Sequence, residues 1–270
     1  MGSARLFSPP PLPHEHGAWA MLAIPPLLGL AAAWPPAAAA WPLLPAMGLL
    51  FLSRDAAVAA ASRVIAGKKV PEGFVGRRVL WGVLEIAAAA LLAAVAWNLA
   101  PPEARGGLGA AAVLTLALGG AHTGLAFAHL DRTAPGVILG MAALASGAPL
   151  MVAAAGRPLD RRGVATGLVA LLYFATSQAY VKAVRGLWKG DRVPRRRCLA
   201  AHAAVAGALV LLIDRGFITP LVAAAFVPVF ARTAWGLRRP PANLRVLGWR
   251  EVAVATVFSC IAISAYALAL

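Results

Sequence analysis

Long apolar stretches recur from one end of the chain to the other, and they constrain the fold more than any other feature. A helix that crosses a bilayer needs roughly 17 to 25 mostly apolar residues. Of the 270 residues, 61% are hydrophobic and only 13% are charged, which excludes a soluble enzyme, a disordered tail and a coiled coil. We predict an all-α, polytopic membrane bundle, one domain over residues 1–270, with about nine transmembrane helices at 18–34, 37–52, 79–97, 108–127, 135–155, 163–181, 198–213, 217–231 and 249–269.

The positions of the charges predict how this bundle is oriented. The 25 Lys and Arg residues outnumber the 10 Asp and Glu residues, for a formal net charge of +15. If nine spans alternate in direction, the basic residues fall on one side except Arg105, Arg157, Arg161, Arg162 and Arg215. The positive-inside rule makes that side the cytoplasm, so segment 1–16 is predicted to be cytoplasmic and the C-terminus to be outside. We expect no cleavable signal peptide, and a composition rich in Ala, Gly, Pro and Arg indicates a bacterial cytoplasmic (inner) membrane protein.

Two long basic connections, 53–78 and 182–197, lie on the predicted cytoplasmic side. If spans one to four and five to eight are parallel repeats, these connections face each other across one cavity. The alternative is that they only set topology and attract anionic lipids, at about 1 kcal/mol per residue. Their concentration favours a site for the head of an anionic amphipathic lipid or isoprenoid, built from Arg54, Arg63, Lys68, Lys69, Lys182 and Arg185. Nucleic acid is not an expected partner, because no soluble domain accompanies the charge.

Ionisable side chains at membrane depth are costly and are therefore functional candidates. Glu85, His122 and His202 fall inside predicted spans. They leave open a proton-coupled transporter or permease and, with His16, a protein that handles haem or metal. The alternative is structural: Glu85 stays solvated near the interface and the histidines form hydrogen bonds within the bundle. The two cysteines lack metal-ligand spacing, so no metal site is predicted and the cofactor is unknown.

Glu15 and His16, just before the first span, are the candidate catalytic residues. A carboxylate and an imidazole at this place can transfer protons. The alternative is that Glu15 stabilises the start of the first helix, where a negative charge is favoured.

Three sequence segments resemble the YwiC-like family of bacterial membrane proteins. They are PHEHGAWAMLAIPPLLGL at 13–30, FLSRDA at 51–56 and YVKAVR at 180–185. The similarity covers nearly the whole chain, and the EHGAW element is its most specific part. The resemblance implies a membrane protein but names no activity.

The predicted architecture also resembles the UbiA-type intramembrane prenyltransferases. In those enzymes the connections after the second and sixth spans carry aspartate-rich motifs that hold Mg²⁺ on a prenyl diphosphate. The resemblance implies a lipid-accessible cavity with a basic mouth, in which Asp55 joins Arg54 at the head group. Here Val58 and Ser62 occupy later aspartate positions, and the second connection has only Asp191. These few carboxylates cannot build the usual magnesium clamp. Ordinary prenyl transfer is therefore not expected, and the sequence leaves open whether the protein is an enzyme.

Overall fold

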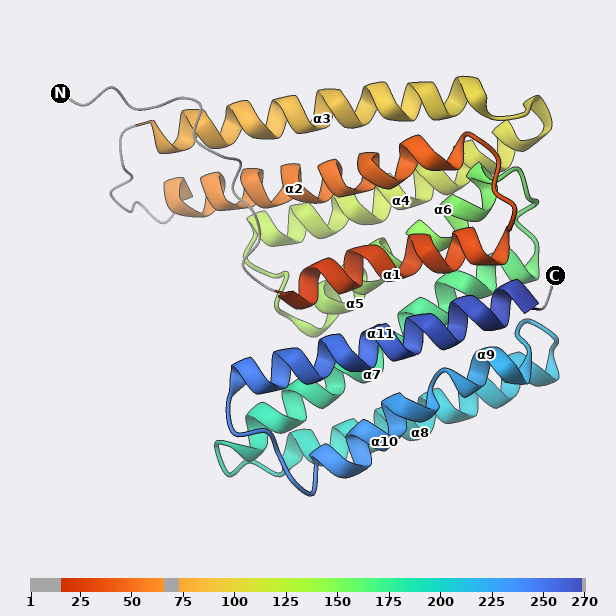
Figure 1. The fold of residues 1–270 in the computed structure, drawn as a ribbon. Helices are drawn as coiled ribbons and strands as arrows, with labels where there is room; N and C mark the ends of the chain where they lie inside the picture. Colours follow the sequence, from red (N-terminus) through yellow and green to blue (C-terminus); the bar gives the residue numbers. More distant parts are fainter. Residues whose placement is uncertain (1–15, 66–72, 269–270) are drawn as a thin grey trace.

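The computed structural model describes residues 16–65 and 73–268, which form helices and no strands (Figure 1). The helices are α1 (His16–Ala32), α2 (Ala40–Ile65), α3 (Phe74–Leu99), the 3-10 helix η1 (Pro102–Ala104), α4 (Arg105–Phe127), α5 (Ala134–Ala145), α6 (Gly147–Ala154), α7 (Arg161–Leu187), α8 (Val193–Asp214), α9 (Pro220–Ala224), α10 (Val227–Gly236) and α11 (Leu244–Leu268).

The predicted all-α membrane architecture is confirmed. Within the described residues, seven helical segments are long and apolar enough to cross a membrane: 40–61, 74–99, 102–127, 134–154, 161–187, 193–214 and 244–268. Shorter apolar helical segments, Trp19–Ala32 and Pro220–Gly236, lie at the first and eighth predicted positions. A total of nine spans stays a prediction, as does the orientation of the termini.

Side-chain caps determine where several of these helices begin. Thr133, Asp160 and Thr219 precede α5, α7 and α9, and each side chain accepts a hydrogen bond from a backbone N–H in the first turn. The cap supplies a partner for a donor that the helix itself leaves unpaired.

Consecutive long helices run in opposite directions, so alternate connections gather at the same end of the bundle (Figure 1). The end at the left of Figure 1 holds the end of α2, the start of α3, and the α7–α8 and α10–α11 connections. We call it the basic end, after Arg63, Arg77, Arg78, Lys189, Arg192, Arg195, Arg196, Arg238 and Arg239. The positive-inside rule predicts that the basic end is cytoplasmic.

The two basic connections are more helical than the sequence suggests. Residues 53–65 continue α2 and residues 74–78 begin α3, while 182–187 and 193–197 belong to α7 and α8. Charged residues mark where a helix leaves the apolar part of the bilayer, but they do not end the helix, because Arg and Lys are good helix formers. The long side chains of these segments therefore lie on fixed helix faces.

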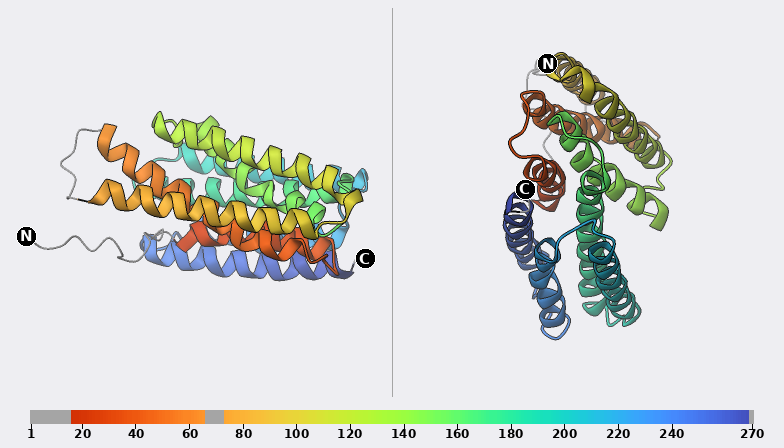
Figure 2. Two further views of the ribbon diagram at one scale, coloured as in Figure 1. Left: turned by 90° about the horizontal axis from the view of Figure 1, so that it is seen from above. Right: turned by 90° about the vertical axis from the view of Figure 1, so that its right-hand side faces the viewer.

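Helix α1 lies between two groups of helices. Figure 2 shows α2, α3 and α4 on one side of it and α8 to α11 on the other. Gly29 of α1 approaches Ala148 of α6 so closely that a Cβ would overlap the Ala148 carbonyl oxygen, a contact that only a small residue allows. Leu91 of α3 and Val113 of α4 are largely exposed, as expected of spans that face lipid.

Candidate functional site

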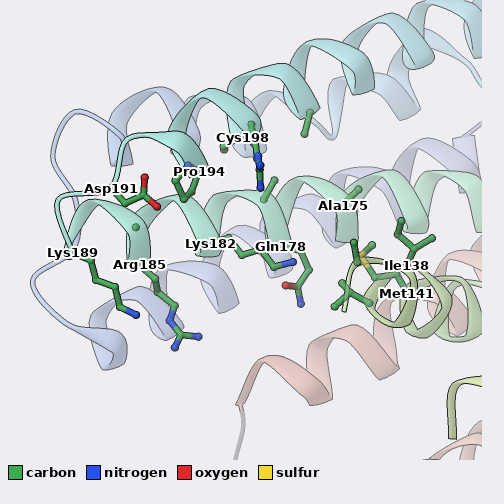
Figure 3. A pocket seen from close by; sticks show the side chains of 16 residues that line it. Ile138, Met141, Ala175, Gln178, Lys182, Arg185, Lys189, Asp191, Pro194 and Cys198 are labelled. Atoms are coloured by element: carbon green, nitrogen blue, oxygen red, sulfur yellow. The ribbon is translucent and has the colours of Figure 1, made fainter. Parts of the chain in front are cut away.

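A groove with a volume of about 800 Å³ opens between α5, α7 and α8 (Figure 3). Its walls come from the first half of α5, the second half of α7 and the start of α8. Because α5 and α8 begin, and α7 ends, at the basic end, the groove extends from that end toward the interior of the bundle.

Four basic side chains line the groove at the basic end. Lys182 and Arg185 are three residues apart on α7, a spacing that places them on one face of the helix, and Lys189 lies in the turn that follows α7. Arg197 joins them from the first turns of α8. Figure 3 shows the side chains of Arg185 and Lys189 extending on the same side of α7. Lys182 and Arg185, which the sequence predicts to bind an anionic head group, thus lie on the same wall of the groove.

One carboxylate, Asp191, is among the residues that line the groove. Its Oδ1 accepts a hydrogen bond of 2.9 Å from the backbone N–H of Val193, where α8 begins. Asp191 therefore pairs the first backbone donor of α8, and the basic side chains of the groove outnumber it four to one.

The inner part of the groove is apolar. Ile138 and Met141 of α5 face Ala175 of α7 and Ala201 of α8 around it, and Gln178 adds a neutral polar group. A site that is basic at one end and apolar at the other suits a ligand with an anionic head and a hydrocarbon tail.

The basic residues of α2 lie elsewhere. Arg54, Asp55 and Arg63 do not line the groove. Nη1 of Arg54 lies 3.2 Å from Oδ1 of Asp55, and the Arg63 guanidinium lies 4.5 Å from the centre of the Phe74 ring on α3. The structure thus places Arg63 against α3, and the described part of the first basic connection does not line this groove.

Three other predicted residues, Glu15, Lys68 and Lys69, lie outside the described residues. His16 is the first residue of α1.

Glu85 belongs to the pairing of α2 with α3. It is only 5% exposed, and no described residue forms a hydrogen bond with its Oε2. Arg78 and Asp55 are charged groups in its surroundings. Glu85 is thus buried between α2 and α3, and it does not line the groove.

The two predicted histidines have separate surroundings. The His122 ring packs against Gly140 of α5. His202 Nδ1 lies 2.8 Å from the carbonyl oxygen of Cys198, and its Nε2 lies 2.8 Å from Oγ1 of Thr233. Because a carbonyl oxygen only accepts, Nδ1 carries the proton, and Nε2 accepts from the Thr233 hydroxyl, which also lies 3.1 Å from the carbonyl oxygen of Val229. Both ring nitrogens of His202 are therefore engaged within the bundle, which favours the structural alternative for this residue.

Among the described residues, no group of three or more His, Cys, Asp and Glu is arranged to hold a metal ion.

A buried ion pair between α10 and α11 was missed by the sequence reasoning. Nη1 of Arg232 lies 2.5 Å from both carboxylate oxygens of Glu251. From α7, the Ser177 hydroxyl donates to Oε2 of Glu251 over 2.6 Å, and the Tyr180 ring centre lies 4.2 Å from the Arg232 guanidinium carbon. We call Ser177, Tyr180, Arg232 and Glu251 the ion-pair cluster.

Arg232 directly follows the predicted span 217–231, and Glu251 is the third residue of the predicted span 249–269. Their side chains are only 5% and 12% exposed. The signal that identifies such a pair is an acidic and a basic residue at similar depth in neighbouring spans.

Comparison with known families adds one match. A family model described as YwiC-like protein matches residues 12–152, just over half of the chain. The chain belongs to the YwiC-like family. No curated protein and no solved structure matches it.

The YwiC-like match begins before α1 and ends within α6. It therefore includes the α5 wall of the groove. The α7 and α8 walls, together with the ion-pair cluster, lie beyond the matched residues.

Proposed function

We propose that this member of the YwiC-like family is a multi-pass protein of the bacterial cytoplasmic membrane that binds an anionic amphipathic lipid or isoprenoid in the groove between α5, α7 and α8. The observation that supports this proposal is the combination of four basic side chains at one end of the groove with an apolar inner part.

The ligand's head lies at the basic end and its tail along the inner groove. Lys182, Arg185, Lys189 and Arg197 attract the anionic head, at about 1 kcal/mol per basic residue near a membrane surface. Ile138 and Met141 contact the tail. Arg54 and Arg63 are not part of this proposed site, because neither of them lines the groove.

Binding fits this groove better than magnesium-dependent prenyl transfer. Mg²⁺ on a diphosphate takes oxygen ligands in octahedral geometry, including carboxylates supplied by the protein. Asp191 is the carboxylate among the lining residues, and its Oδ1 is already bonded to the start of α8. We therefore propose a lipid-binding protein or carrier rather than a standard transferase.

The test uses the purified full chain in detergent, with farnesyl diphosphate as the anionic probe and farnesol as its uncharged counterpart. We expect farnesyl diphosphate to raise the thermal unfolding midpoint and farnesol to raise it much less. The double variant Lys182→Ala/Arg185→Ala should bind farnesyl diphosphate about tenfold or more weakly, since two favourable charges are lost.

The double variant Arg195→Ala/Arg196→Ala is the matched control. It removes the same charge from the same connection, but neither residue lines the groove. The proposal fails if farnesyl diphosphate leaves the unfolding midpoint unchanged, or if the two double variants weaken binding equally.

A further inference from the structure

The ion-pair cluster leaves one edge of Arg232 without a partner in the described chain. The Arg232 side chain is 5% exposed, and its Nε and Nη2 are buried with no acceptor among the described residues. The Tyr180 hydroxyl is also buried and unpaired within the same part of the chain. Unpaired buried donors cost about 1–3 kcal/mol each, and native proteins pair nearly all of them. The Arg232 edge therefore indicates an acceptor outside the described residues.

The geometry of the guanidinium selects the type of acceptor. Glu251 accepts hydrogen bonds only from Nη1. The N–H groups of Nε and Nη2 lie parallel on the other edge, and this fork matches two oxygens on one carbon, sulfur or phosphorus atom. The Tyr180 hydroxyl supplies one more donor to the same cluster. A small oxyanion, such as a carboxylate, offers the two acceptors that the Nε–Nη2 edge requires.

The charge of the cluster adds a condition. Arg232 and Glu251 neutralise each other, so a bound anion would leave one uncompensated negative charge where charge is costly. A proton on Glu251 restores neutrality. The ionisable groups around Glu251 are Arg232 of α10, Tyr173 and Tyr180 of α7, Cys198 and His202 of α8, and Arg250 of α11. Glu251 is the carboxylate among them.

We propose that Arg232 binds a small oxyanion through its Nε–Nη2 edge, together with one proton on Glu251. Arg232 lies four residues before the end of α10 and Glu251 seven residues after the start of α11, so both lie within about two turns of the basic end. The proton reaches Glu251 from that end, where 12% of its side chain is exposed. This site lies across α7 from the groove, and neither Arg232 nor Glu251 lines that groove.

The experiment titrates acetate and sulfate, each adjusted to pH 7, into the purified full chain in weakly buffered detergent. Binding and proton uptake are recorded together, and we expect about one proton taken up per acetate bound. Glu251→Gln should bind acetate without proton uptake. Arg232→Lys should bind about tenfold or more weakly, because an ammonium lacks the fork. Chloride, a single atom, should not compete at the same concentration.

Two further variants separate this proposal from misfolding and from the lipid site. Arg232→Gln/Glu251→Gln removes both charges at once, so no charge is left unpaired; it should fold, by its unfolding midpoint, and bind no acetate. Lys182→Ala/Arg185→Ala should bind acetate like the wild type. The proposal is overturned if neither acetate nor sulfate binds, if the Arg232 variants bind as the wild type does, or if Glu251→Gln takes up as many protons as the wild type.

Discussion

Gly236 of α10 lies directly against the hydroxyl of Tyr180 on α7. A Cβ at position 236 would overlap Oη of Tyr180 and crowd its ring carbons. Since the Tyr180 ring also lies beneath the Arg232 guanidinium, the absence of a side chain at Gly236 lets α10 hold Arg232 at this place.

Gly236→Ala should therefore destabilise the protein by roughly 1–3 kcal/mol, the usual cost of forcing extra atoms into a packed site. The measurement is the thermal unfolding midpoint in detergent. Tyr180→Phe removes the overlapping hydroxyl and should recover part of the loss in the double variant. Gly248→Ala is the control, because a Cβ there meets nothing within 4 Å. Equal effects of the two alanine substitutions would contradict this account.

Thr233→Val should also destabilise the protein, because it removes the donor to His202 Nε2 and keeps the shape of the side chain. The expected cost is about 1–3 kcal/mol for a buried acceptor left unpaired. Thr233→Ser keeps the hydroxyl and should cost less. Unfolding midpoints of the two variants check this. A Thr233→Ser variant as unstable as Thr233→Val would show that the methyl group, not the hydrogen bond, matters.

The arrangement of His202 predicts that it does not ligate haem. Its Nδ1 is held by the Cys198 carbonyl and its Nε2 by Thr233, so an iron ion would have to displace a hydrogen bond. Protein purified from cells supplied with a haem precursor should show no Soret absorption band that depends on His202. A Soret band that disappears in His202→Ala would refute this prediction.

The predicted orientation can be checked with cysteines placed at opposite ends of the bundle. Arg239 and Arg162 are both exposed. In a Cys260→Ser background, Arg162→Cys should react with a membrane-impermeant thiol reagent in spheroplasts, whereas Arg239→Cys should react only after the membrane is opened. The opposite pattern would place the basic end outside.

Much of the fold could be predicted from the sequence, because apolar length and proline content report directly on how a segment meets the bilayer. The ends of the helices could not be predicted, because Arg and Lys continue a helix beyond its apolar segment, as in α2 and α7. The long apolar runs that locate spans also say little about how the spans pack side by side. This is why Arg54 and Arg63 were grouped with Lys182 and Arg185, although neither of them lines the groove.

Part of the proposed lipid site could be grouped from the sequence, because Lys182 and Arg185 lie three residues apart on α7 and this spacing fixes their common face. Arg232 and Glu251 were missed for the opposite reason. Their significance depends on contact between two spans, and a position near a span end looks the same for a solvated charge as for a buried one.

Helix α7 separates the groove from the ion-pair cluster, with Gln178 on one side and its neighbour Ser177 on the other. A shift or rotation of this one helix alters both walls at once. If both proposed ligands bind, reciprocity follows: whatever factor the lipid applies to oxyanion affinity, the oxyanion applies to lipid affinity. Measuring one ligand's affinity at saturation with the other would thus show whether α7 transmits energy between a membrane lipid and a water-soluble anion.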